Sequence, residues 1–229
     1  MPQVDEDPQR FDRFAEAYDR CRTVIDRPIW PRLAELGVPE GGRALDVGCG
    51  SGHRAVDLAR HVDEVVAIDL SAPLIEIAAT RRPRPTVRYA CADVADFEDP
   101  DGFDLVYSAN TLHHVEPLGP TLDRLRALVR PGGWAVLTDN VHRRPWLSWI
   151  WRHGGYRLAP LPDLGRARAA GRRGMWEYYR FETSRPWVAH MRSDRYLTPE
   201  GFEAAYLGAF PGGEVRHHGL ATLVWHRAA

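Results

Sequence analysis

The chain has 229 residues, a mass of 25.9 kDa and a formal net charge of −1. This length predicts one α/β domain, with or without an insertion, and the net charge argues against a basic nucleic-acid-binding protein. The longest apolar runs have the length of strands, so we expect no transmembrane segment. The N-terminus lacks the basic and apolar stretches of a secretory signal. Three widely spaced cysteines, Cys21, Cys49 and Cys91, suggest neither disulfides nor a metal pair, so we expect a cytoplasmic protein.

Two helices are predicted before residue 40, an amphipathic one over 8–22 and a short one that ends at Gly37. An alternation of strands and helices then begins. The pattern predicts strands at 43–47, 64–69, 86–93, 103–108 and 134–138, helices at 51–61, 72–82 and 121–129, and a turn at 131–133. This alternation is typical of a doubly wound α/β fold with a parallel sheet.

The last 32 residues predict a helix and two closing strands. Thr198 can cap the helix, with Pro199 in its first turn. Residues 211–213 end the helix, and 214–218 and 221–226 form two strands that we expect to be antiparallel. We therefore expect a single domain over residues 1–229, with a helical cap at 1–40.

Residues 141–197 differ in composition from the rest of the chain. All 30 basic residues of the protein are arginine, and 12 of them lie here against four acids. The segment also holds five of the eight tryptophans. It is too long for a plain loop, so we expect an insertion with helices of its own.

A glycine loop follows the first strand of the alternation, with glycines at Gly48, Gly50 and Gly52. Glycines between a strand and a helix permit a tight turn and the close approach of a ligand to the backbone. The exposed N–H groups favour an anionic or polar ligand group, although a plain tight turn is the alternative. The spacing G-x-G-x-G differs from the G-x-G-x-x-G of dinucleotide enzymes, which favours an adenosine ligand without a diphosphate.

Two aspartates end the next two predicted strands. Asp69 lies about 20 residues beyond the loop, where a carboxylate can accept hydrogen bonds from both ribose hydroxyls. Asp93 ends the third strand, where a carboxylate can accept from the adenine amine. An isolated aspartate at a strand end is usually a turn former or a cap. Their succession after the glycine loop favours a nucleoside site instead.

Five segments together resemble the class I S-adenosylmethionine-dependent methyltransferases, in particular the small bacterial branch known as type 11 or UbiE-like. In chain order these segments are residues 45–52, 67–69, 92–94, 110–115 and 129–133. The resemblance implies a Rossmann-like seven-stranded sheet of order 3-2-1-4-5-7-6, with strand 7 antiparallel. It also implies that residues 141–197 form an acceptor-binding lid between strand 5 and the last helix.

The resemblance further implies the cofactor S-adenosyl-L-methionine, its product S-adenosyl-L-homocysteine, and the residues that hold them. The glycines would lie beneath the methionine moiety, Asp69 would bind the ribose and Asp93 the adenine amine. Tyr18 would close over the cofactor carboxylate, although it could instead anchor the first helix in the core. The predicted cofactor-binding residues are Tyr18, Asp46, Gly48, Gly50, Gly52, Asp69, Leu70, Asp93, Val94 and Asn110.

Histidines near the same edge of the sheet supply a candidate base. A neutral hydroxyl acceptor must lose a proton, and an imidazole suits that task. His113 and His114 follow the fourth strand and Asp139 ends the fifth, and these strands are neighbours in the implied sheet order. Similar natural-product O-methyltransferases use such a pair, so we predict His113 as the base, Asp139 as the group that orients it, and His114 as the second candidate. A histidine that only lines the pocket is the alternative, His142 is a lesser candidate, and we expect no metal.

The aromatic and arginine side chains of residues 141–197 favour a small acceptor that is aromatic or bulky and apolar, and could be anionic. They could equally form a small core with arginine outside. Residues 149–151 could rest on a membrane surface. We expect O-methylation in specialised metabolism by a monomer or homodimer. Two alternatives are tRNA modification, against which the net acidity argues, and a protein that keeps the cofactor as a cyclase or regulatory partner.

Overall fold

The computed structural model describes residues 11–142 and 171–229. Its contacts divide the chain into two compact units. The sheet unit comprises residues 27–143 and 196–229, and the helical unit comprises residues 1–26 and 144–195. This division does not show what each unit does. Three assignments therefore stay predictions: the single domain over 1–229, the cap at 1–40 and the lid at 141–197.

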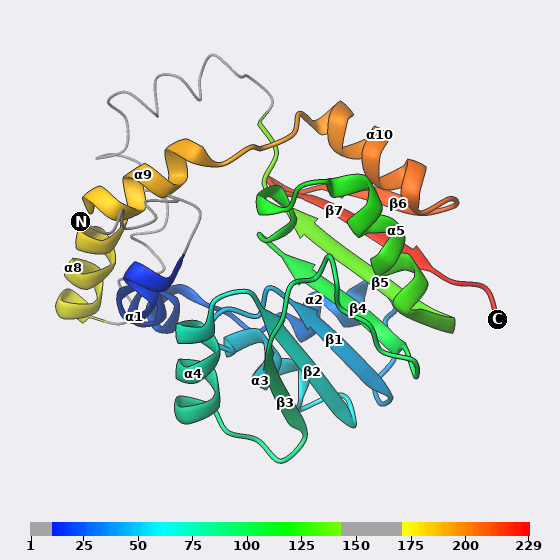
Figure 1. Cartoon of the computed structure of the whole chain (residues 1–229), viewed down its shortest axis with the longest axis horizontal. Coiled ribbons are helices and arrows are strands. Elements are labelled where there is room, and N and C mark those ends of the chain that lie inside the picture. The colour runs from blue at the N-terminus through cyan, green and yellow to red at the C-terminus, as the bar shows by residue number, and fades with distance from the viewer. Residues whose placement is uncertain (1–10, 143–170) are drawn as a thin grey trace. The chain divides into compact units, whose positions relative to one another are not determined.

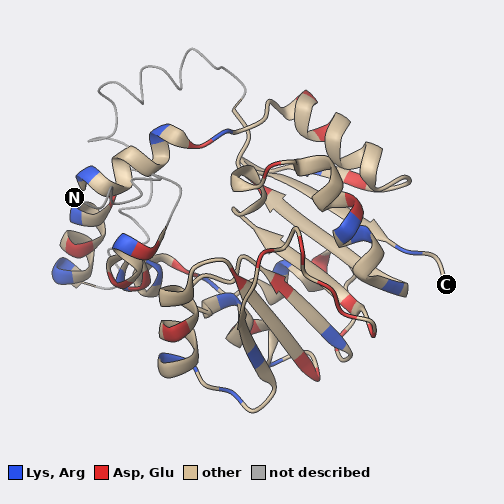
Figure 2. Cartoon of the chain, viewed as in Figure 1, with Lys and Arg blue, Asp and Glu red and all other residues tan. Residues whose placement is uncertain are grey.

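The sheet unit contains a seven-stranded sheet of order β3-β2-β1-β4-β5-β7-β6 (Figure 1). In this sheet β7 runs antiparallel to both of its neighbours, and the other pairs are parallel. The predicted fold class and strand order are confirmed. Few strand residues are acidic or basic (Figure 2). The strands are β1 (Arg43–Val47), β2 (Glu64–Asp69), β3 (Val87–Cys91), β4 (Phe103–Ala109), β5 (Val129–Asp139), β6 (Glu214–His217) and β7 (Ala221–His226).

Helices cover both faces of the sheet because the strand residues alternate between two apolar clusters. Leu45 and Val47 of β1 face the cluster that contains residues of α5 and α10, whereas Ala44 faces the cluster that contains residues of α2 and α3. The α-helices of this unit are α2 (Trp30–Glu35), α3 (His53–Leu58), α4 (Ala72–Arg81), α5 (Leu118–Leu128) and α10 (Pro199–Ala209), and a short 3₁₀ helix η2 spans Leu112–His114.

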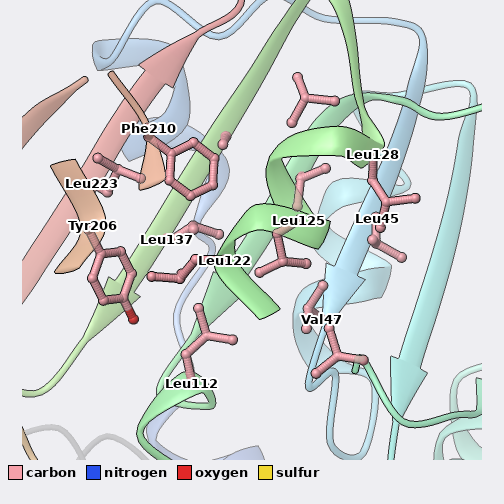
Figure 3. Close-up of a cluster of buried hydrophobic side chains, with 14 of the residues drawn as sticks. Leu45, Val47, Leu112, Leu122, Leu125, Leu128, Leu137, Tyr206, Phe210 and Leu223 are labelled. Carbon is pink, nitrogen blue, oxygen red and sulfur yellow. The ribbon is translucent and has the colours of Figure 1, made fainter. Parts of the chain in front are cut away.

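The larger cluster, which contains residues of α5 and α10, also holds the segment on which the candidate site lies. Leu122 and Leu125 of α5 are fully buried there beside Leu137 of β5 and Tyr206 of α10 (Figure 3). Leu112, the first residue of η2, joins the same cluster. Full burial of one such side chain contributes about 1.5–3 kcal/mol. Burial of Leu112 therefore anchors the segment that carries His113.

Several predicted boundaries differ from the structure. α3 is shorter at both ends than the helix predicted over 51–61, and two further differences lie near β5. The turn predicted at 131–133 is wrong, because β5 continues through these residues. Its pairing with β4 shifts register between Phe103 and Leu105, and Gly132 adopts a φ of +77° within the strand. α5 begins three residues earlier than predicted, at Leu118. Pro120 does not interrupt it, because the N–H groups of a first helical turn need no partner within the helix.

The described part of the helical unit contains η1 (Phe11–Phe14), α1 (Ala15–Ile25), α8 (Gly171–Glu182) and α9 (Arg185–Ser193). Phe14 and Cys21 pack against Tyr178 and Phe181 of α8 in a separate apolar cluster. The insertion therefore contains helices of its own, as predicted. Within residues 11–142 and 171–229, no helix combines the length and the hydropathy needed to cross a bilayer.

An ion-pair network joins the start of β1 to the loop before β4. The Arg43 guanidinium donates to both carboxylate oxygens of Asp99, at 2.7 and 3.0 Å, and to Glu64 at 2.9 Å. These hydrogen bonds hold the pKa of the Asp99 carboxyl below its ordinary value. A lowered folded-state pKa stabilises the fold above the unfolded pKa, and this stabilisation disappears as the pH falls through the folded pKa.

The substitution Asp99→Asn is therefore expected to lower the free energy of unfolding at pH 7 by about 1–3 kcal/mol and to flatten its decline on the acid side. Urea titrations from neutral to acid pH would measure both effects. Glu214→Gln is the control, because Glu214 pairs with Arg216 in an exposed site where an ion pair contributes little. An Asp99→Asn protein with the wild-type dependence of stability on pH would contradict this role.

Candidate functional site

The glycine loop adopts a conformation that other residues tolerate poorly. Gly48, Gly50 and Gly52 have φ angles of +69°, +55° and +86°. A Cβ added at Gly48 would overlap the Thr111 side chain, and one at Gly52 would lie 2.8 Å from the Tyr89 hydroxyl. The loop is thus confined on one side by Thr111, in the segment after β4, and on the other side by Tyr89 of β3.

Asp69, at the end of β2, holds this loop in place. Its carboxylate accepts hydrogen bonds from the backbone N–H of Gly50 at 2.8 Å and from that of Ser71 at 2.9 Å. These two hydrogen bonds tie the end of β2 to the glycine loop and to the start of α4. Burial, and then the charges of Asp46 and Asp69, raise the pKa of the Cys49 thiol, which remains neutral.

The other predicted residues of the adenosine end lie at the ends of β2 and β3. Leu70 directly follows Asp69 and is 70% exposed. Asp93 is exposed and accepts a hydrogen bond from the N–H of Ala95 at 2.8 Å, whereas Val94 is buried in the larger cluster. These three residues lie on the loops next to Asp69, because β3 pairs with β2 up to the register Asp69–Cys91.

Asn110 directly follows β4 in a left-handed conformation, with φ +57°. Its N–H donates to the carbonyl of Thr138 at 2.9 Å, and its side-chain oxygen accepts from the Asn140 amide at 3.1 Å. Asn residues adopt this conformation more readily than most. Asp46 lies in β1 and is nearly fully buried. Asp46 in β1 and Asn110, directly after β4, thus lie on neighbouring parts of the sheet, because β1 pairs with β4.

His113 and Asp139 meet as the sequence predicts. The His113 Nδ1 atom lies 2.6 Å from one oxygen of the Asp139 carboxylate, and the His113 N–H donates to the other oxygen at 2.9 Å. Both side chains are nearly buried, at 6% and 5% exposure. A carboxylate accepts hydrogen bonds, so it favours the tautomer with the proton on Nδ1 and the lone pair on Nε2. This is the form of imidazole that can accept a proton.

Burial, and then the charge of Asp139, raise the pKa of the Tyr206 phenol. The phenol therefore stays neutral near the Asp139 carboxylate. The Asp139 carboxylate also accepts a hydrogen bond from the Asn140 N–H at 2.8 Å. The contacts with the His113 ring, the His113 N–H and the Asn140 N–H together fix the orientation of the Asp139 carboxylate.

A group of neighbouring rings connects His113 with Tyr196, a residue that the sequence analysis did not single out. The centroid of the His114 ring lies 3.8 Å from that of the His113 ring. The ring of Tyr196, the residue before Leu197, lies 4.7 Å from the His113 ring. Tyr196 also stacks on His142 at 4.5 Å. The N–H of His142 donates to the carbonyl of Leu197 at 2.9 Å, which brings the two ends of the insertion together. That pairing is a long-range contact with no local signal in the sequence.

Tyr18 lies in the helical unit, with Phe11 at 5.2 Å and Trp187 at 6.1 Å between ring centroids. This placement fits the alternative of a core anchor, and its role toward the cofactor stays a prediction. Trp146, Trp149, Trp151 and Tyr156 of the predicted acceptor surface lie outside the described residues. Of the others, Tyr178 and Phe181 are buried, whereas Trp176 is exposed.

Comparisons with known proteins agree on one family. Residues 45–137 match the family model described as a methyltransferase domain. The chain is 38% identical over 148 residues to an uncharacterized methyltransferase of Mycobacterium tuberculosis, a match that covers 64% of this chain and 71% of that protein. It is 28% identical to a ubiquinone biosynthesis O-methyltransferase of Bradyrhizobium, over 81% of this chain and 70% of that protein.

The fold is also shared with solved structures. An S-adenosylmethionine-dependent methyltransferase from Mesorhizobium loti superposes with a TM-score of 0.60 at 20% identity. The superposition covers 88% of this chain and 98% of that one.

Proposed function

The chain belongs to the class I S-adenosylmethionine-dependent methyltransferases, and we propose that it methylates a hydroxyl of a small acceptor that is aromatic or bulky and apolar. The observation that carries this proposal is the contact of 2.6 Å between His113 Nδ1 and the Asp139 carboxylate. It prepares a nearly buried imidazole for proton transfer at the carboxyl ends of β4 and β5, where ligands of such sheets bind.

S-Adenosyl-L-methionine is the cofactor of this enzyme, and the residues present fit it. The Asp69 carboxylate lies at the end of β2 beside the glycine loop, which it contacts through the N–H of Gly50, and a carboxylate at this place can accept hydrogen bonds from ribose hydroxyls. The glycines of the loop have positive φ angles and no side chains, so a ligand can approach the backbone closely. Asp93 is exposed at the end of β3, where it can accept from an amine. We propose that Asp69 binds the ribose, Asp93 the adenine amine and Gly48–Gly52 the methionine moiety.

When bound, the cofactor supplies a methyl group on a positively charged sulfur. Much of the remaining work is positioning, since the reaction is an in-line displacement. The Nε2 atom of His113 would accept the hydroxyl proton as the new O–C bond forms and the bond between sulfur and the methyl group breaks. Asp139, hydrogen-bonded to Nδ1, keeps the ring oriented and stabilises the imidazolium that results. The proton remains on His113 until solvent removes it, so the histidine is restored.

The comparison with Bradyrhizobium supports the choice of oxygen, because that relative is named an O-methyltransferase of ubiquinone biosynthesis. A neutral hydroxyl needs a base whereas an amine that is already deprotonated does not. The geometry of His113 and Asp139 therefore favours oxygen over nitrogen as the methyl acceptor. We propose a small molecule as the acceptor.

The test is a screen of phenols, hydroxyquinones, aromatic amines and transfer RNA with the purified chain and methyl-labelled cofactor. We expect equimolar S-adenosylhomocysteine and a product methylated on oxygen, located by mass spectrometry and NMR. Methylation of only amines or only RNA would contradict the proposal. Cofactor binding without any methylated product across the panel would instead favour a regulatory or cyclase role.

A further inference from the structure

Helix α8 has two opposite faces. Gly174, Tyr178 and Phe181 are buried, and the last two pack on α1. A helix turns by about 100° per residue, so the opposite face is centred on Trp176. The residues within about 60° of Trp176 are Arg172, Arg173, Tyr179 and Arg180. These four residues and Trp176 are called the α8 outer face.

The centre of the α8 outer face is apolar and exposed. Trp176 is 60% exposed, whereas Tyr178, two residues later on the buried face of the helix, is 2% exposed. It is one of only four large apolar side chains exposed among residues 11–142 and 171–229. Its ring stacks on that of Tyr179, with centroids 6.2 Å apart. An exposed indole beside a half-buried phenol is an apolar surface that the described residues 11–142 and 171–229 leave open.

Cations surround this centre. All three arginines of the α8 outer face are exposed, as are the three others between residues 171 and 195 (Figure 2). The three acids of that stretch are all at least partly buried. Glu177 pairs with Arg173 at 3.1 Å, Glu182 accepts from the Trp187 indole at 2.9 Å, and Asp194 is 3% exposed. The surface potential of the α8 outer face is therefore positive.

We propose that the α8 outer face docks on an anionic lipid bilayer. Indole and phenol rings partition into the interface between headgroups and acyl chains, while arginines around them bind lipid phosphates. RNA also offers negative charge, and its bases stack on aromatic rings, but only a bilayer offers a continuous apolar layer next to a plane of phosphates, which matches one indole ringed by arginines. This inference concerns the helical unit alone and does not depend on the acceptor.

The experiment measures the binding of the full chain to vesicles by co-sedimentation. Vesicles of phosphatidylglycerol and phosphatidylcholine are compared with vesicles of phosphatidylcholine alone, at about 0.05 and about 0.5 M salt. We expect binding to the anionic vesicles at low salt, weakened at high salt. Arg172→Gln/Arg173→Gln/Arg180→Gln should lower the partition coefficient on the order of 100-fold, since each arginine near the surface contributes about fivefold. Trp176→Ser should lower it about tenfold.

Matched variants separate this face from general effects of charge and hydropathy. Arg32→Gln/Arg60→Gln/Arg84→Gln removes the same charge from exposed positions of the sheet unit. Leu207→Ser removes an apolar side chain that is 37% exposed on α10. Both controls should bind anionic vesicles as the wild type does. Circular dichroism and thermal melts would establish that every variant is folded.

Three outcomes would overturn the proposal. The first is no binding to anionic vesicles at low salt, with or without binding to transfer RNA. The second is equal binding to the two kinds of vesicle. The third is an equal loss in the α8 variants and in their sheet-unit controls. Because no arm of the experiment uses catalysis, failure of the proposed methylation reaction leaves this test unaffected.

Discussion

Replacing His113 with alanine is expected to lower kcat on the order of 10²- to 10⁴-fold, because the acceptor hydroxyl loses its base. The affinity for S-adenosylhomocysteine should remain within about twofold of wild type, since no contact of the imidazole with the glycine loop is proposed. Single-turnover kinetics with the acceptor from the screen would measure the first quantity, and calorimetry the second. A fall in kcat with unchanged cofactor affinity separates loss of a base from loss of a folded site.

The pH dependence sharpens this test. A protonated imidazole cannot accept the hydroxyl proton, so wild-type kcat should fall on the acid side, and this fall should be absent from the residual activity of the variant. His114→Ala and His142→Ala are the matched controls, because the His114 ring lies 3.8 Å from the His113 ring and the His142 ring stacks on Tyr196, which itself contacts His113. A loss below about threefold in His113→Ala, or a larger loss in His114→Ala, would move the base away from His113.

Asp139 is a poorer position for the same test. Its carboxylate accepts from the backbone N–H of His113 and of Asn140 as well as meeting the His113 ring. Asp139→Asn would therefore disturb the loops after β4 and β5 together with the tautomer. Its effect on kcat could not be assigned to the imidazole alone.

The edge of the sheet could be predicted because each of its residues carries a local signal. Asp69 and Asp139 directly end apolar runs, and a parallel sheet places such strand ends at one edge. The meeting of His113 with Asp139 follows from the order of strands 4 and 5 alone. Their hydrogen bonds to particular backbone N–H groups could not be predicted, because these depend on how each loop turns after its strand.

Other features have no local signal or a misleading one. Tyr196 approaches His113 because residues 142 and 197 pair across the whole insertion, and such a contact leaves no mark on the neighbouring sequence. The residues at 131–133 have the composition of a turn, yet β5 runs through them because Gly132 and Gly133 exchange backbone hydrogen bonds with Arg227, and Gly132 takes a conformation that other residues avoid. Tertiary hydrogen bonding outweighs local propensity at that position.

Removing the carboxylate of Asp69 is expected to have the largest effect on cofactor binding. In Asp69→Ala, the affinity for S-adenosylhomocysteine should fall about 10- to 100-fold, since each lost bond to a charged group costs about 1.5–3 kcal/mol. Two causes contribute to this loss. One is the proposed pair of bonds to the ribose hydroxyls, and the other is the loss of the bonds to the N–H groups of Gly50 and Ser71 that hold the loop.

Ligands with altered ribose separate these two causes. The affinity of the wild type for S-adenosylhomocysteine should exceed that for its 2′,3′-dideoxy analogue by about tenfold or more, because the analogue lacks the hydroxyls that would donate to the Asp69 carboxylate. If Asp69 contacts the ribose, Asp69→Ala binds the two ligands with nearly equal affinity, so the ratio collapses. If Asp69 only holds the loop, both affinities fall together and the ratio stays at its wild-type value, which would refute the ribose contact. Ser71→Ala keeps the backbone donor and serves as the control, since its ratio should match wild type.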